Sequence, residues 1–271
     1  MYKFLLIDCG LSDNTLESYL HDFKFFDLIS NQLCKPPITK VLSLKMNTIN
    51  HPKTLSRRLS ALKIYYSFFD LAWPKDFPKF PKFESLPRVP SEKVVLEILS
   101  SIETKTKISD VMRARDRVIF QLLYGCGLRI SELSFLNVDD VLKNSFLLKV
   151  LGKGSKERLI PISPPILNNI LLYLKLRSLL KPKVKKLIIN KHGKMISRQG
   201  LWKIVKNYAS GQDLHPHSFR HAFASHCLNN GMDVRHLQVL LGHSSPNTTQ
   251  IYTQVKKDNI VKLLQKISPF F

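Results

Sequence analysis

The stretch H-P-H-S-F-R-H-A-F-A at residues 215–224 decides the fold of the larger part of this chain. Pro216 suits the first position of a helix, because its φ is already helical and its missing N–H is not needed there. His217, Arg220 and His221 then lie three and four residues apart, on one face near the helix N-terminus. Free N–H groups at a helix N-terminus attract anions, and an arginine fork can bind two phosphate oxygens. The stretch therefore predicts a helix that begins at a phosphate-binding site.

A zinc site is the competing interpretation, since His217 and His221 have i, i+4 spacing. Ser218 stands where an H-E-x-x-H motif has its glutamate, and Arg220 within the same turn would repel the metal. We therefore expect no metal at these residues. Taken singly, the histidines are equally typical of surface residues or helix caps.

The charge of the chain also favours a polyanionic partner. Its 271 residues carry 42 Lys and Arg against 20 Asp and Glu, a net charge of +22. Such a surplus repels itself in a compact monomer unless a polyanion such as nucleic acid neutralises it. No apolar run approaches the roughly 20 residues of a membrane span, and residues 1–10 lack a signal-peptide pattern. We expect a cytoplasmic, nucleoid-associated protein without a membrane partner.

Cysteine usage fits an intracellular protein. Cys9, Cys34, Cys126 and Cys227 are scattered and form no C-x-x-C pair. This spacing favours neither a zinc knuckle nor a disulfide framework. We expect four reduced thiols, most of them buried.

Prolines divide the chain into two domains. Five of them lie between Trp73 and Pro90, among Lys and Phe, which predicts an extended linker. We expect an N-terminal domain over residues 1–80, a linker over 81–90 and a C-terminal domain over 91–271. Residues 88–271 hold 30 of the 42 basic residues and 12 of the 20 acidic ones, so the larger domain should make most phosphate contacts.

The N-terminal domain reads as wholly helical. The spacing of Asn14 and Glu17 predicts a capping pair at the start of one helix, and a second helix begins after Pro52. The face of this second helix opposite its apolar side includes Lys53 and Arg57. Either a solvated polar face or a surface laid against DNA would account for these cations.

The C-terminal domain reads as helical with one β-hairpin. Residues 146–151 and 158–162 are β-like and flank the polar turn G-K-G-S-K-E, which predicts a hairpin with an exposed basic tip. Residues 186–190 suggest one more short strand. Helices are expected over residues 91–102, 111–124, 164–180, 198–208, 217–230, 233–241 and 255–267.

At this point the residues resemble the tyrosine recombinases, and within them the Xer-type chromosome-dimer resolvases. The resemblance rests on G-L-R-I-S-E-L at 127–133, G-K-G-S-K-E-R at 152–158, the stretch at 215–224, and L-G-H-S-S-P-N-T-T-Q-I-Y at 241–252. More weakly, L-S-D-N-T-L-E-S-Y and S-R-R-L-S-A-L-K resemble a core-binding domain. The implied fold is mainly α: a helical, SAM-like N-terminal domain and an α-rich catalytic domain with a small antiparallel hairpin or sheet.

The resemblance also implies roles for individual residues. Arg129 and Arg220 would bind the scissile phosphate, His217 and His243 would donate further hydrogen bonds, Lys153 would protonate the leaving 5′ oxygen, and Tyr252 would become a 3′-phosphotyrosine. Supporting roles fall to Glu132, which would hold Arg129, and to His221. The expected DNA contacts are Lys53, Arg57, Arg58, Lys156 and Arg158. His217 is our candidate for accepting the tyrosine proton, which the sequence by itself does not decide.

The implied activity is site-specific recombination of duplex DNA through a Holliday junction, used to resolve chromosome dimers. Xer systems imply a paralogous recombinase in a heterotetramer and a DNA translocase as activator. Other interpretations stay open: an integrase or invertase of a mobile element, a type IB topoisomerase, and a catalytically inactive architectural DNA-binding protein.

Overall fold

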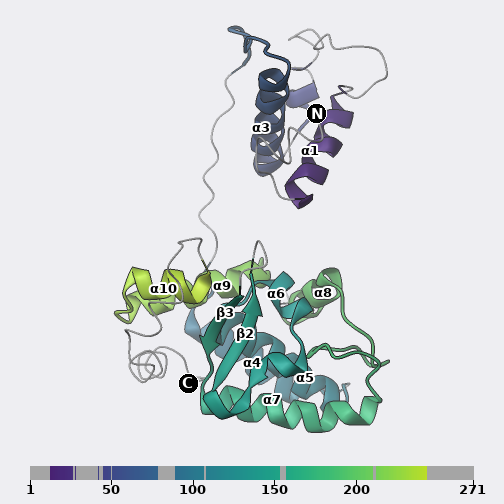
Figure 1. Cartoon of the computed structure of the whole chain (residues 1–271), viewed down its shortest axis with the longest axis vertical. Coiled ribbons are helices and arrows are strands. Elements are labelled where there is room, and N and C mark those ends of the chain that lie inside the picture. The colour runs from purple at the N-terminus through teal and green to yellow at the C-terminus, as the bar shows by residue number, and fades with distance from the viewer. Residues whose placement is uncertain are drawn as a thin grey trace. The chain divides into compact units, whose positions relative to one another are not determined.

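The structure is a computed structural model, shown in Figure 1. It describes residues 13–26, 28, 42, 45–49, 51–78, 89–106, 108–152, 157–209 and 212–242, except for the side chains of residues 13, 14, 52 and 53. The chain divides into two compact units, Met1–Leu86 and Pro87–Phe271. The division falls within the proline-rich segment, and each unit is described by itself.

The smaller unit is built on the helices α1 (Asp13–Phe25) and α3 (Pro52–Phe68), which contact each other. Proline opens α3, as expected from its φ and missing N–H. Aromatic rings fill the space between the helices, for example Phe23 and Tyr65, whose centroids are 5.7 Å apart. This unit therefore has a core of its own.

In the larger unit, α4 (Glu92–Thr104) and α5 (Asp110–Phe120) form where apolar periodicity predicts them. The Ser91 hydroxyl caps α4 by accepting a hydrogen bond from the N–H of Val94. α5 packs on α7 (Pro164–Arg177), which Figure 1 shows along one side of the unit. These helices lie in one large apolar core with the sheet.

The sheet is small, antiparallel and in the order β1-β2-β3. β2 (Leu147–Leu151) and β3 (Glu157–Pro161) form the expected hairpin, while β1 (Val141–Leu142) adds a strand that we did not predict. Hairpin residues 153–156 lie outside the described ranges. The short strand expected at 186–190 is absent: this region makes only isolated bridges, one of them joining Asn137 to Lys186.

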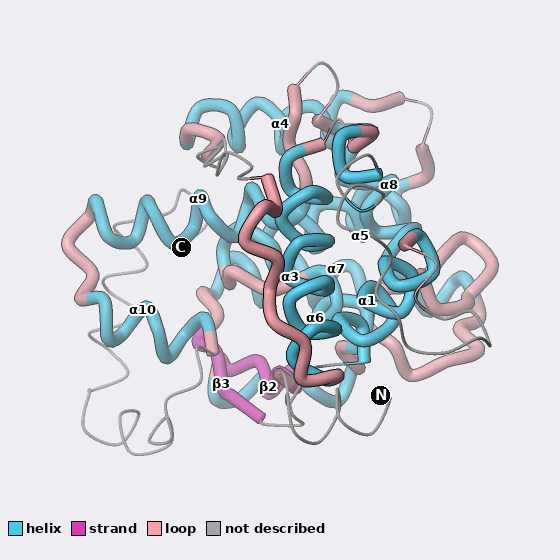
Figure 2. The backbone as a smooth tube through the Cα atoms, turned by 90° about the horizontal axis from the view of Figure 1, so that it is seen from above, coloured by secondary structure: helices cyan, strands magenta, loops and turns pink. Residues whose placement is uncertain are grey.

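Three further helices, α8 (Arg198–Tyr208), α9 (Pro216–Asn229) and α10 (Val234–Leu241), agree with the predicted ones. α9 and α10 contact each other, and Figure 2 shows them side by side and joined by a short turn. The end of α10 lies against β3. The helix expected at 255–267 lies outside the described residues.

The described helices contain none that is both long and apolar enough to cross a bilayer.

Candidate active site

The residues that follow α5 hold part of the site in place. α5 continues as a π-helix over Gln121–Gly125, and Gly127 then adopts φ +60°. A Cβ on Gly127 would lie 2.5 Å from the ring of Phe223 on α9, so only glycine lets the turn approach α9 this closely. π-helical turns are frequent at functional sites, and this one ends four residues before Arg129.

Arg129 caps the short helix α6 (Ile130–Phe135), which we did not predict. Its backbone N–H donates to Glu132 Oε2 (2.8 Å), and its Nη1 donates to Glu132 Oε1 (2.8 Å). The same carboxylate thus fixes both the backbone and the guanidinium of Arg129, whose side chain remains one-third exposed. The expected pairing of Glu132 with Arg129 is present in the structure.

Arg220 reaches the same place from the first half of α9. Its Nη1 donates to the carbonyl of Gly127 (2.5 Å), and its Nη2 donates to the carbonyl of Leu241 (2.6 Å), at the end of α10. Arg129 Nη1 donates to that same Leu241 oxygen (3.4 Å). Burial and the nearby charge of Arg129 lower the pKa of Arg220 to about 10, which still leaves it protonated at neutral pH. Two guanidiniums from distant parts of the sequence therefore meet at one carbonyl oxygen.

His217 lies on the exposed side of the first turn of α9. Desolvation of its ring, together with the positive charges of His215, His221, Arg220 and Arg129, lowers its pKa. A neutral imidazole at pH 7 follows, with one ring nitrogen free to accept a proton.

Two neighbouring histidines have different positions. His215 is the N-cap of α9, and its Nδ1 accepts a hydrogen bond from the N–H of Ser218 (3.2 Å). His221, one turn after His217, is exposed on the surface of α9. What the described part of the chain shows of its expected supporting role is this position next to His217 on α9.

The position of Arg158 corrects an expectation. We predicted a DNA contact, but its side chain is only 5% exposed and forms a two-pronged ion pair with Glu132 (2.8 and 2.9 Å). Its Nε donates to the carbonyl of Leu240 (3.0 Å). Because all of these donors point into the protein, Arg158 has no face toward DNA, and we remove it from the proposed DNA contacts.

Glu132 is therefore the centre of the arrangement. Although burial alone would raise the pKa of this carboxyl, hydrogen bonds and charges from Arg158 and Arg129 lower it below its ordinary value. Arg220 Nη1 lies 3.8 Å from Oε2. Three guanidiniums around one carboxylate leave a net positive charge next to His217, as binding of a phosphate requires.

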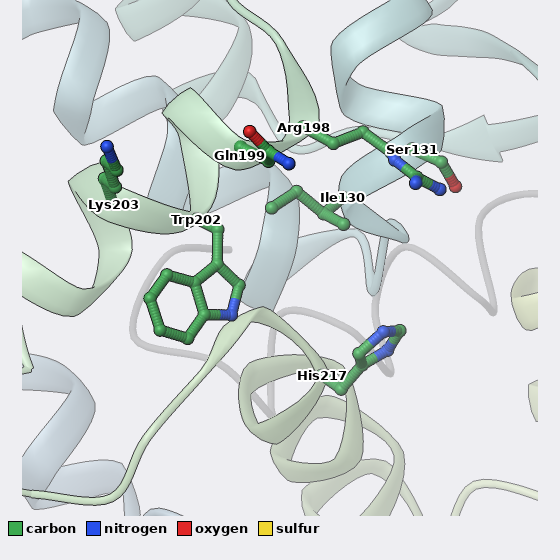
Figure 3. A pocket seen from close by; sticks show the side chains of 7 residues that line it. All are labelled: Ile130, Ser131, Arg198, Gln199, Trp202, Lys203 and His217. Carbon is green, nitrogen blue, oxygen red and sulfur yellow. The ribbon is translucent and has the colours of Figure 1, made fainter. Parts of the chain in front are cut away.

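A pocket of about 520 Å³ opens beside His217, between α6, α8 and α9. Figure 3 shows the side chains of Arg198, Trp202 and His217 around this hollow. Every polar side chain in its lining can donate a hydrogen bond and none is acidic; the lining comprises Ile130, Ser131, Arg198, Gln199, Trp202, Lys203 and His217. We did not predict this pocket from the sequence, which shows only that Trp202 follows Arg198 by one helical turn. The 45% exposure of Trp202 is known from the structure alone.

In the smaller unit, Arg57 and Arg58 both bind Asp22, which is fully buried (2.8 and 3.3 Å). The guanidinium of Arg58 also lies 3.5 Å from the ring centroid of Phe25, and its side chain is only 12% exposed. Arg57 is 38% exposed. Arg58 thus packs inside this unit, contrary to our expectation of a DNA contact, whereas Arg57 is partly exposed to solvent.

The remaining expected site residues are not described by the structure. Lys153, Lys156, His243 and Tyr252 lie outside the described ranges, as does the side chain of Lys53. Within those ranges, Cys126 and Cys227 are free and buried thiols, and no three His, Cys, Asp or Glu side chains lie together as a metal site would require.

Comparison with known proteins identifies a family and relatives in sequence. Residues 89–259 match the phage integrase family. The chain is 33% identical over 287 residues to the tyrosine recombinase XerD of Staphylococcus haemolyticus (98% of this chain, 96% of the relative) and 31% identical over 291 residues to that of Staphylococcus epidermidis (98% and 96%).

Two solved structures share the fold. The Tn1549 transposon integrase in complex with transposon right end DNA has a TM-score of 0.67 and 19% identity, covering 98% of each chain. The XerH site-specific recombinase bound to its difH substrate has a TM-score of 0.66 and 22% identity, covering 92% of this chain and 78% of that one. Because the family match spans most of the larger unit and the XerD relatives span nearly the whole chain, this chain belongs to the phage integrase family and is a tyrosine site-specific recombinase.

Proposed function

We propose that the larger unit cleaves DNA by attack of the Tyr252 hydroxyl on a backbone phosphate. The new bond joins the tyrosine oxygen to phosphorus, the bond to the 5′ oxygen breaks, and Lys153 supplies the proton that this oxygen needs. Attack by the free 5′ hydroxyl of a partner strand reverses the step and reseals the DNA. The phosphotyrosine ester conserves the bond energy, so the cycle needs neither ATP nor a cofactor.

The observation that carries this proposal is the meeting of Arg129 and Arg220 at the carbonyl of Leu241. Each guanidinium has five N–H donors, and these contacts use only some of them. The remaining donors can bind the two non-bridging oxygens of a phosphate and strengthen their hold as charge builds in the transition state. His217, and His243 from beyond the described residues, would add further donors.

His217 is our candidate for the group that accepts the tyrosine proton. A free tyrosine has a pKa of about 10, so attack at neutral pH needs a base or nearby cations. The lowered pKa of His217 leaves it neutral and able to take the proton. Its position beside Arg129 and Arg220 then keeps the resulting positive charge close to the phosphate.

The DNA contacts that we propose are Arg57, Lys53 and Lys156, together with the lining of the pocket beside His217. Arg198 and Lys203 supply charge there, and the exposed indole of Trp202 supplies both an N–H and a flat apolar face. Phosphate contacts of this kind position the duplex without selecting its sequence.

The biological role that we propose is resolution of chromosome dimers through a Holliday junction, in the cytoplasm and at the nucleoid. The XerD relatives, which match over nearly the full chain, support this role. A paralogous recombinase would share the tetramer, and a DNA translocase would activate it. Integration of a mobile element is the second candidate, because the Tn1549 integrase shares the fold.

The test of the chemistry is a covalent trap. The probe is a nicked duplex whose site comes from sequencing the DNA that the protein holds covalently in its host. We expect wild type to form a protein–DNA adduct on a denaturing gel, and Tyr252→Phe to bind this duplex without forming one. Tyr173→Phe, which alters a buried tyrosine of the same unit, should still form the adduct. An adduct from Tyr252→Phe would show that the nucleophile is another residue.

Three assays on the wild-type protein distinguish a recombinase from a topoisomerase and from an architectural protein: strand exchange, plasmid relaxation and adduct formation. A recombinase exchanges strands between two sites and leaves a supercoiled plasmid without a site unrelaxed. A type IB topoisomerase would relax that plasmid, and an architectural protein would bind the site without any adduct.

A further inference from the structure

We propose that Arg158 is a positioning residue for strand cleavage, an inference that rests on the proposed function of Arg129 and Arg220. It would neutralise Glu132 and hold the end of α10, so that the two phosphate-binding arginines keep both their place and their charge. Arg158 contributes in three ways. It occupies acceptor positions of the Glu132 carboxylate, it anchors the end of α10, and it leaves the positive charges of Arg129 and Arg220 available to a phosphate.

The first contribution is the filling of the Glu132 carboxylate. Oε1 accepts from Nη1 of Arg158 and Nη1 of Arg129, and Oε2 accepts from Nη2 of Arg158 and the backbone N–H of Arg129. A carboxylate has about four acceptor positions, and these four donors occupy them. Two of the four come from Arg158. Without Arg158, two of the four acceptor positions of Glu132 would lack a donor, and the carboxylate would attract other cations.

The second contribution is at the end of α10. Arg158 donates to the carbonyl of Leu240, while Arg129 and Arg220 donate to that of Leu241. The last carbonyls of a helix have no partners within it and carry the negative end of its dipole, so three guanidiniums form a strong cap. Gly242 ends the helix at φ +66°, and a Cβ there would lie 3.0 Å from Cδ of Arg158.

This anchoring joins two catalytic segments. Arg158 lies on β3, five residues after Lys153, and Gly242 directly precedes His243. A single side chain therefore links the hairpin to the start of the segment that carries His243 and Tyr252. Any movement of Arg158 would be passed on to both arginines through Glu132 and through the carbonyls of α10.

The third contribution is charge. Arg158 is buried with Glu132 (5% and 4% exposed), so these two charges neutralise each other. Arg129 and Arg220 then retain their positive charges for the phosphate. If Arg158 were removed, the nearest alternative for Glu132 would be Arg220, whose Nη1 already lies 3.8 Å from Oε2. The carboxylate would compete with the phosphate for that guanidinium.

The experiment compares Arg158→Met and Arg158→Lys with Arg177→Met. Arg177 is a matched control: it is also buried and also donates to backbone carbonyls, those of Val184 and Lys186, but it does not contact Glu132. For each variant we would measure affinity for the nicked duplex, thermal unfolding and the single-turnover rate of adduct formation. The rate is measured on two duplexes, one with a normal scissile phosphate and one with an uncharged methylphosphonate at that position.

Wild type must first form the adduct, and its failure to do so would overturn the proposed function rather than this inference. We then expect Arg158→Met to slow adduct formation on the phosphate duplex by about 100-fold, the cost of misplacing reacting groups, with binding little changed. On the methylphosphonate the loss should be at least tenfold smaller, because less negative charge needs stabilising. Arg177→Met should show the same ratio of rates on the two duplexes as wild type.

Two results would overturn the proposal. One is a folded Arg158→Met protein that cleaves the phosphate duplex at the wild-type rate. The other is a loss of equal size on both duplexes, which would mean that Arg158 only stabilises the fold. If Arg158→Met does not fold, Arg158→Lys decides between these outcomes, since it keeps the charge but loses the fork. We expect an intermediate loss from it, again smaller on the methylphosphonate.

Discussion

Each unit has a buried carboxylate that two or more arginines surround, and the two arrangements differ. In the larger unit, Glu132 has a partner at every acceptor position and its pKa is lowered. In the smaller unit, Arg57 and Arg58 both bind Oδ1 of Asp22, while Oδ2 is buried with no hydrogen-bond partner among the described residues. Burial raises the pKa of Asp22 more than its arginines lower it.

Geometry contributes to this difference, in addition to the third guanidinium, that of Arg220, which lies 3.8 Å from Oε2 of Glu132. A guanidinium fork that meets a carboxylate edge-on forms two parallel hydrogen bonds, as Arg158 does with Glu132. Two arginines that converge on one oxygen cannot do the same. We expect the first arrangement to hold its arginines in place, and the second to let Arg57 exchange Asp22 for another anion such as a phosphate.

The largest effect should come from truncating the two acids. Glu132→Ala leaves Arg158 buried without its partner, which should lower the free energy of unfolding by about 3–5 kcal/mol and abolish adduct formation. Asp22→Ala should cost about 1–2 kcal/mol, because Arg57 can turn to water. Urea unfolding of both variants measures this. Equal losses would show that the two arrangements are energetically alike.

A substitution at the end of α10 should have a smaller effect on the free energy of unfolding. Gly242→Ala places a side chain in the left-handed region, at a cost of about 1–2 kcal/mol, and also presses on Arg158. Gly231→Ala is the matched control, because Gly231 has φ +86° but a Cβ added there would meet nothing within 4 Å. Adduct formation should fall in Gly242→Ala only. If both variants kept full activity, the contact with Arg158 would not matter for cleavage.

The pH dependence of stability should have opposite signs at the two acids. The stabilisation from Glu132, with its lowered pKa, is present above the ordinary carboxyl pKa of about 4.3 and is lost as pH falls through the folded value. Asp22, with its raised pKa, favours folding at low pH and loses that contribution as pH rises through its folded value.

Comparison with isosteric variants tests these signs. At neutral pH, Glu132→Gln should destabilise the protein, whereas Asp22→Asn should change the free energy of unfolding by less than about 1 kcal/mol in either direction. The Glu132→Gln difference from wild type should shrink in acid. A difference of the same sign and pH trend in both variants would contradict the comparison.

The smallest effect should separate Arg57 from Arg58. If Arg57 exchanges Asp22 for a DNA phosphate, Arg57→Ala should weaken DNA binding and lower the slope of log affinity against log salt by about one. Arg58→Ala should instead lower stability, since this side chain packs on Phe25. Titrations at several salt concentrations provide the measurement, and an unchanged slope in Arg57→Ala would remove that residue from the DNA contacts.

Local patterns in the sequence were enough for most of the fold. Apolar periodicity, caps and glycines placed α4, α8, α9 and α10 within a few residues, and the β2–β3 hairpin was expected from its polar turn. Arg129 and Arg220 were singled out because the motifs around them resemble those of a known family, and their binding of a phosphate stays a prediction. These features depend on neighbours in the chain, which a sequence displays directly.

The direction in which a charged side chain points was decided only by the tertiary structure. Arg158, Arg58 and Arg57 all looked like DNA contacts, yet the packing of α10 and β3 buries the first and the ring of Phe25 covers the second. The pocket beside His217 likewise forms from three helices that are separate in sequence. Whether a guanidinium meets a carboxylate, a carbonyl or solvent depends on which distant segments fold against it, and no local pattern encodes that.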